Sequence, residues 1–171
     1  ERGVVRIDQE QQISIDAPVG HTSALKPRVF SLSETEFYDQ LEQTNPEGSK
    51  KLKEFLSILA GVGIEAEFRK SLVLRFFPSP DGSASAGYIT ATGKFHPGDG
   101  WWSANKLGQT EIGQKYLEKL ADLIEGGLRA RDHNRAPFLV GRDGTGAKIE
   151  MLLDKLPEWA DVTAELVMKL S

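Results

Sequence analysis

The chain has 171 residues, of which 39% are hydrophobic and 27% are charged, and its formal net charge is -4. This length favours one compact domain, and no apolar run approaches the roughly 20 residues of a membrane-spanning helix, so we expect a cytoplasmic protein without membrane contact. Because cysteine is absent, disulfides, thiolate nucleophiles, iron–sulfur clusters and cysteine-bound zinc are excluded.

The first 45 residues predict a hairpin followed by a helix. Hydrophobic residues in β-type patterns at positions 4–7 and 13–15 flank a polar turn, and an aperiodic stretch with two prolines then reaches residue 30. Ser33 and Glu36 have the spacing of a capping box, in which each side chain binds the backbone N–H group of the other residue. A helix is therefore expected from this box to about Gln43.

Residues 46–127 predict a helix–strand–strand–strand–helix core. Asn45 and Pro46 suit the N-cap and the first position of a helix, and the apolar stripe that follows them indicates packing on a sheet. Alternating patterns predict strands at residues 64–68, 72–77 and 88–91, with residues 94–96 returning beside the third. The segment Pro97–Gly108 is predicted to be a loop, and the second core helix is expected to begin at Thr110.

Residues 128–171 predict a second hairpin and helix. Phe138–Val140 and Lys148–Leu153 have strand patterns on either side of a glycine-rich turn, and Pro157 suits the start of a final helix. The predicted fold class is therefore α+β, with a central, mostly antiparallel sheet and hairpin–helix additions at both ends. We expect the three parts, residues 1–45, 46–127 and 128–171, to form one compact domain.

The candidate binding residues gather in and beside the predicted loop. They combine two adjacent tryptophans with charged groups and a histidine, and they are Lys94, His96, Asp99, Trp101, Trp102 and Lys106. Adjacent tryptophans in an extended segment point to opposite sides, so one can lie in the core while the other stacks on a base, a sugar or a peptide side chain. Two alternatives stay open: both tryptophans cover the end of the sheet, or His96 and Asp99 form an acid–base pair.

Other patterns point less directly to chemistry. Gly141–Lys148 resembles a phosphate-binding loop, but Ala147 separates the second glycine of the motif from its lysine, so the spacing fails. The three histidines are too widely spaced for a local metal motif, and no metal or other cofactor is predicted. A cluster of arginines between the second core helix and the next strand fits an anion site or a solvated linker, and it contains Arg129, Arg131 and Arg135.

The leading functional hypothesis is a non-enzymatic accessory or interaction domain of a larger intracellular protein, because the chain begins at Glu1 and shows no catalytic constellation. One alternative is a metal-dependent nuclease-like fold, active or degenerate, whose element order is similar and whose carboxylates would come from Glu65, Glu67 and Asp81. The other is a non-catalytic nucleic-acid-binding module that contacts phosphates through Lys50, Lys51, Lys53, Lys94 and Lys106. The expected partner is a protein or a nucleic acid.

Overall fold

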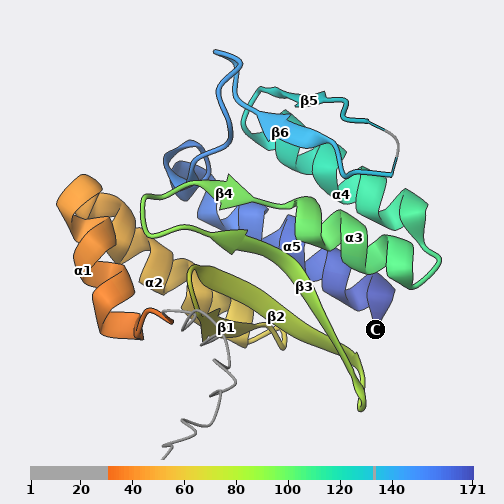
Figure 1. Cartoon of the computed structure of the whole chain (residues 1–171), viewed down its shortest axis with the longest axis horizontal. Coiled ribbons are helices and arrows are strands. Elements are labelled where there is room, and N and C mark those ends of the chain that lie inside the picture. Colours follow the sequence, from red (N-terminus) through yellow and green to blue (C-terminus); the bar gives the residue numbers. More distant parts are fainter. Residues whose placement is uncertain (1–30, 133) are drawn as a thin grey trace, which may run out of the picture.

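The computed structural model describes residues 31–132 and 134–171, and its fold is α+β (Figure 1). An antiparallel sheet has the order β1–β2–β3–β4, from Glu65–Phe68, Leu72–Ser79, Gly82–Ile89 and Phe95–His96. The helices are α1 (Glu34–Thr44), α2 (Pro46–Ala60), α3 (Gly98–Lys106), α4 (Thr110–Leu123) and α5 (Leu156–Leu170). The predicted fold class is confirmed in this part of the chain, whereas the N-terminal hairpin lies outside the described residues.

Local signals determine where the first two helices begin. At the start of α1, the Ser33 hydroxyl accepts a hydrogen bond from the Glu36 N–H group (3.2 Å), and the Glu36 carboxylate accepts one from the Ser33 N–H group (2.8 Å). At the start of α2, the Asn45 side chain accepts from the Gly48 N–H group at 2.7 Å, and Pro46 takes the first turn. Both predicted caps are confirmed.

The core lies between one face of the sheet and the helices α2 and α5, which are behind the sheet in Figure 1. Leu72, Leu74 and Phe76 of β2 are fully buried on this face. Trp159 of α5 is also fully buried, and its ring stacks on that of Phe55 with centroids 3.7 Å apart. None of the described helices is long and apolar enough to cross a membrane.

The opposite face of the sheet, which we call the open face, carries Val73, Arg75, Phe77, Tyr88 and His96. These side chains alternate with the buried ones along β2, where partly and fully buried residues follow each other. The register pairs Val73 with Tyr88 and Tyr88 with His96, so the three side chains form a row across three strands. Polar and aromatic groups of the sheet are therefore presented together on an accessible surface.

The prediction of a loop at Pro97–Gly108 is wrong, because most of this segment forms α3. Glycines lower the intrinsic helix propensity of this segment, but Gly100 allows the helix to approach β3 closely. A Cβ atom at this position would lie 2.9 Å from the carbonyl oxygen of Ala86 and 2.6 Å from the ring of Tyr116. The helix thus depends on tertiary packing that the local sequence does not reveal.

The helix α3 covers the edge of β3 beyond the end of β4. The Ser103 hydroxyl accepts a hydrogen bond from the Ser85 N–H group (3.0 Å) and donates one to the Ser85 carbonyl (2.8 Å). Both residues are buried. One side chain therefore satisfies the two backbone groups that a further strand would otherwise pair.

The prediction of a strand at Lys148–Leu153 is also wrong. The segment forms two short 3-10 helices, η1 (Ile149–Met151) and η2 (Leu153–Lys155). The strand β6 (Phe138–Val140) pairs instead with β5 (Gly127–Arg129), in a ribbon of two strands. The third strand of the main sheet also begins earlier than predicted, at Gly82, because its small residues pack beneath α3.

Candidate functional site

The predicted site residues fall on three surfaces around β4 and α3. Lys94 and His96 line one pocket, whereas three residues on one side of α3 line a groove, namely Asp99, Trp102 and Lys106. Trp101 lies apart from both, beside the first turns of α4. The structure therefore brings five of the six predicted residues to two neighbouring surfaces, and their role in binding stays a prediction.

The two tryptophans do not point to opposite faces of a strand, because they belong to a helix. Successive residues of an α-helix are about 100° apart around its axis, and the rings of Trp101 and Trp102 meet edge to face with centroids 5.2 Å apart. Trp101 is partly buried against the core, while 38% of Trp102 is exposed. Only Trp102 offers its ring to a partner in the groove.

The groove between α3 and the end of the β2–β3 hairpin has a volume of about 470 Å³. It contains one carboxylate, Asp99, whose pKa is raised by burial and partly lowered again by its neighbours Ser85 and His96. Its cations are Lys106 and Arg75. Arg75 is already paired with Glu67, so the groove has no strong excess of either charge.

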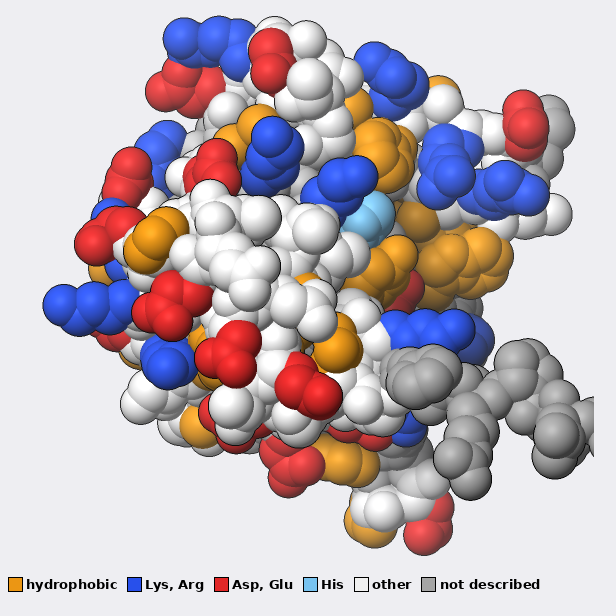
Figure 2. Space-filling model, turned by 60° about the vertical axis from the view of Figure 1, so that its left-hand side comes forward, with side chains coloured by type: hydrophobic (Ala, Val, Ile, Leu, Met, Phe, Trp, Pro, Cys, Tyr) orange, Lys and Arg blue, Asp and Glu red, His pale blue; other side chains and the backbone are white. Residues whose placement is uncertain are grey.

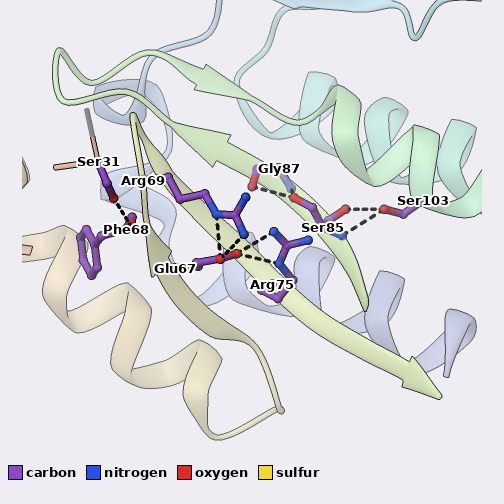
Figure 3. A network of polar contacts seen from close by, with 8 residues as sticks. All are labelled: Ser31, Glu67, Phe68, Arg69, Arg75, Ser85, Gly87 and Ser103. Carbon is purple, nitrogen blue, oxygen red and sulfur yellow. Dashed lines mark hydrogen bonds and ion pairs between the residues drawn. The ribbon is translucent and has the colours of Figure 1, made fainter. Parts of the chain in front are cut away.

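Of the carboxylates considered for a metal site, Glu67 is held between two arginines (Figure 3). Glu67 accepts hydrogen bonds from the Nη2 atom of Arg75 at 2.6 Å and from the Nε atom of Arg69 at 2.7 Å. These hydrogen bonds hold the pKa of Glu67 below its usual value. Within the described ranges, no group of three histidine, aspartate or glutamate side chains is placed to hold a metal ion.

A second pocket, of about 350 Å³, lies between β4 and the turn that follows β6. We call it the basic–aromatic pocket and define it by Lys94, His96, Phe138 and Lys148. Figure 2 shows histidine, which among the described residues is His96 alone, in a hollow bordered by Lys and Arg side chains and by hydrophobic ones. Charge and aromatic surface thus meet at one place on the open face.

Lys94 and Lys148 stand directly opposite each other in an isolated antiparallel bridge. The Phe95 N–H group donates to the Ala147 carbonyl and the Ile149 N–H group donates to the Gly93 carbonyl, both at 2.9 Å. Hydrogen bonds on both sides make the lysines a non-hydrogen-bonded pair, in which Cα atoms are about 4.5 Å apart and side chains are closest.

Phe95, Ala147 and Ile149, the chain neighbours of the two lysines, are buried. Because successive side chains of an extended segment point to opposite sides, the lysine side chains point outward. Neither lysine has an ion-pair partner in the part of the chain that the structure describes. Like charges directly opposite each other on a sheet are destabilising. An anion between the two ammonium groups would relieve that repulsion.

Three aromatic rings and a guanidinium group border the lysine pair. The rings of Tyr88 and His96 are stacked, with centroids 4.5 Å apart and planes 14° apart, and the ring of Phe138 lies 6.4 Å from that of His96. The Arg131 guanidinium lies 5.7 Å from the centre of the Phe138 ring, in cation–π contact. Burial lowers the pKa of His96, and the charges of Lys94 and Arg131 lower it further against the opposing effect of Asp99.

Sequence reasoning missed Phe138 and Lys148, because both belonged to strands of a predicted hairpin. The sequence places Arg131 in a candidate anion site, but nothing in the sequence connects it with Lys94. Comparison of the chain with protein-family models, with curated proteins and with solved structures finds no match. The function is therefore inferred from the geometry of the site.

Proposed function

We propose that this chain is a non-enzymatic interaction module that binds an anionic partner at the basic–aromatic pocket. The observation that carries the proposal is the lysine pair of the pocket. Lys94 and Lys148 are fixed face to face by backbone hydrogen bonds on both sides, at a cost in repulsion that an anion removes. A cytoplasmic location and a place within a larger protein stay predictions from the sequence.

Two acidic groups lie near the pocket, and neither forms an ion pair with Lys94 or Lys148 within the described residues. The Asp143 carboxylate accepts hydrogen bonds from the Thr145 hydroxyl (2.7 Å) and N–H group (3.0 Å), which hold its pKa below the usual value, and the charge of Lys148 lowers it further. Asp143 thus offsets part of the positive charge of Lys148, whereas Lys94 has no ion-pair partner among the described residues. Burial raises the pKa of Asp99, and this residue lines the adjoining groove rather than the pocket. The pocket therefore keeps a positive charge that a partner can neutralise.

A binding role also fits the groups that the pocket lacks within the described residues. Its lining contains lysines, a histidine and aromatic side chains but no carboxylate. The carboxylate nearest in sequence to His96, Asp99, lies in the adjoining groove. Glu67, which a nuclease-like site would use, is paired with two arginines. These features favour recognition over the metal-dependent alternative.

The test is binding of a fluorescently labelled inorganic polyphosphate at low salt. We expect the wild type to bind and the K94Q/K148Q double variant to bind at least about tenfold more weakly, because two phosphate contacts are lost. The matched control is K50Q/K115Q, which removes two exposed lysines outside the pocket and should change the affinity less than about twofold. Equal loss in both double variants, or no binding by the wild type, would overturn the proposal.

A further inference from the structure

The rings of the basic–aromatic pocket form a platform for a flat ligand. Tyr88 supports one side of the His96 imidazole by stacking, so the histidine ring has a fixed orientation. Phe138 stands at an angle of 59° to it, and both rings are partly exposed. Such a platform can stack on a nucleobase, because every base has an aromatic face.

Three cations lie beside this platform. Lys94 and Lys148 lie on the paired segments at the base of the pocket, while Arg131 lies over Phe138. A pocket of about 350 Å³ is at the small end of ligand sites, which span about 300–1,000 Å³, so it holds one nucleotide unit rather than several. Three cations around a one-nucleotide platform can contact more than one phosphate of a chain.

We propose that the basic–aromatic pocket binds single-stranded nucleic acid, with one base stacked against Phe138 and His96 and its flanking phosphates on Lys94, Lys148 and Arg131. This inference rests on the proposed function and names the partner of the same site. A single strand fits better than a duplex, because the bases of a duplex are already stacked and cannot reach the rings. It fits better than a phosphopeptide, which would leave the aromatic platform without a base to stack on.

The experiment compares four ligands by fluorescence anisotropy with the full chain. They are a single-stranded 12-mer of thymidine, an abasic phosphodiester of the same length, a 12-base-pair duplex and a free thymidine nucleotide. We expect the 12-mer to bind most tightly, and at least about fivefold more tightly than the abasic strand, because stacking of one base is lost. Three phosphate contacts predict a slope of log affinity against log salt of about -2.

The variants separate stacking from charge. F138A should lower the ratio of the affinity for the 12-mer to the affinity for the abasic strand from at least about fivefold to about one. F138L keeps an apolar side chain without the aromatic ring, and it should show the same loss if F138A does not fold. The control F77A removes an exposed phenylalanine elsewhere on the open face, and it should leave the preference for bases intact.

Each other outcome overturns the inference in a recognisable way. Equal binding of the abasic strand and the 12-mer identifies an anion site without base recognition, and the proposed function survives. Equal binding of the free nucleotide, or tighter binding of the duplex than of the 12-mer, replaces single-stranded nucleic acid by that ligand. No binding of any anion removes both this inference and the proposed function.

Discussion

Replacing Lys148 with glutamate is expected to stabilise the unliganded protein and to remove its affinity for anions. In the wild type, Lys94 faces Lys148 at a position where cross-strand side chains are closest. Removing a like-charge pair and creating an opposite-charge pair each contribute about 0.2–1 kcal/mol. K148E should therefore raise the free energy of unfolding by up to about 2 kcal/mol, less the attraction between Lys148 and Asp143 that the change removes, since the exposed side chain leaves no cavity when it is replaced.

Urea denaturation followed by tryptophan fluorescence measures this change as a higher midpoint at an unchanged slope. The gain should shrink in about 1 M salt, where the screening length falls to about 3 Å. The control K115E alters a lysine in α4 with Glu111 and Glu118 one turn before and after it, so it should lower stability. A K148E protein that is no more stable than the wild type at low salt contradicts the repulsion, and with it the main reason to expect an anionic partner.

Three further predictions test the edge of β3 and the histidine. S103A leaves the buried N–H and carbonyl groups of Ser85 without partners, and it should lower the free energy of unfolding in urea by about 2–4 kcal/mol. The control S83A changes an exposed serine of the same strand and should lower it by less than about 0.5 kcal/mol. G100A places a methyl group against backbone and Tyr116, and it should lower the unfolding free energy by about 1–3 kcal/mol; a stabilised variant would show that α3 is not so close. The pKa of His96 is lowered in the unliganded protein, and a bound anion raises it. Affinity for the 12-mer should therefore increase as the pH falls through the pKa of His96 in the complex, and H96Q should flatten this dependence.

Elements with signals inside their own sequence could be predicted, and elements held by distant contacts could not. The caps at Ser33 and Asn45 work within three residues of the helix start, so the sequence shows them directly. The helix α3 contains two glycines in its first turn, and glycine disfavours a helix. Only the close packing of Gly100 on Ala86, which the sequence does not show, explains why a helix forms there. The predicted strand after residue 148 failed for a related reason, since its buried residues pack in 3-10 turns with the same hydrophobic pattern.

The candidate site was predictable only in part, because it is assembled from separate segments. Lys94 and His96 attracted notice as polar residues beside aromatic ones in a short stretch. Their partners Lys148 and Phe138 lie far along the chain, and the bridge that places Lys148 opposite Lys94 is set by backbone hydrogen bonds rather than by side-chain type. No periodicity in either segment encodes that register.

The position of the pocket gives ligand binding a direct link to the stability of the whole described fold. Lys148 belongs to the segment that leads into η1 and α5, and this segment contributes Ile149 and Trp159 to the same hydrophobic core as Phe55 and Phe95. We therefore expect a ligand that neutralises Lys94 and Lys148 to strengthen the contact between the sheet and the C-terminal elements. A ligand that binds only the folded state stabilises it by mass action. Binding at the pocket should therefore raise the free energy of unfolding of the core that these elements share.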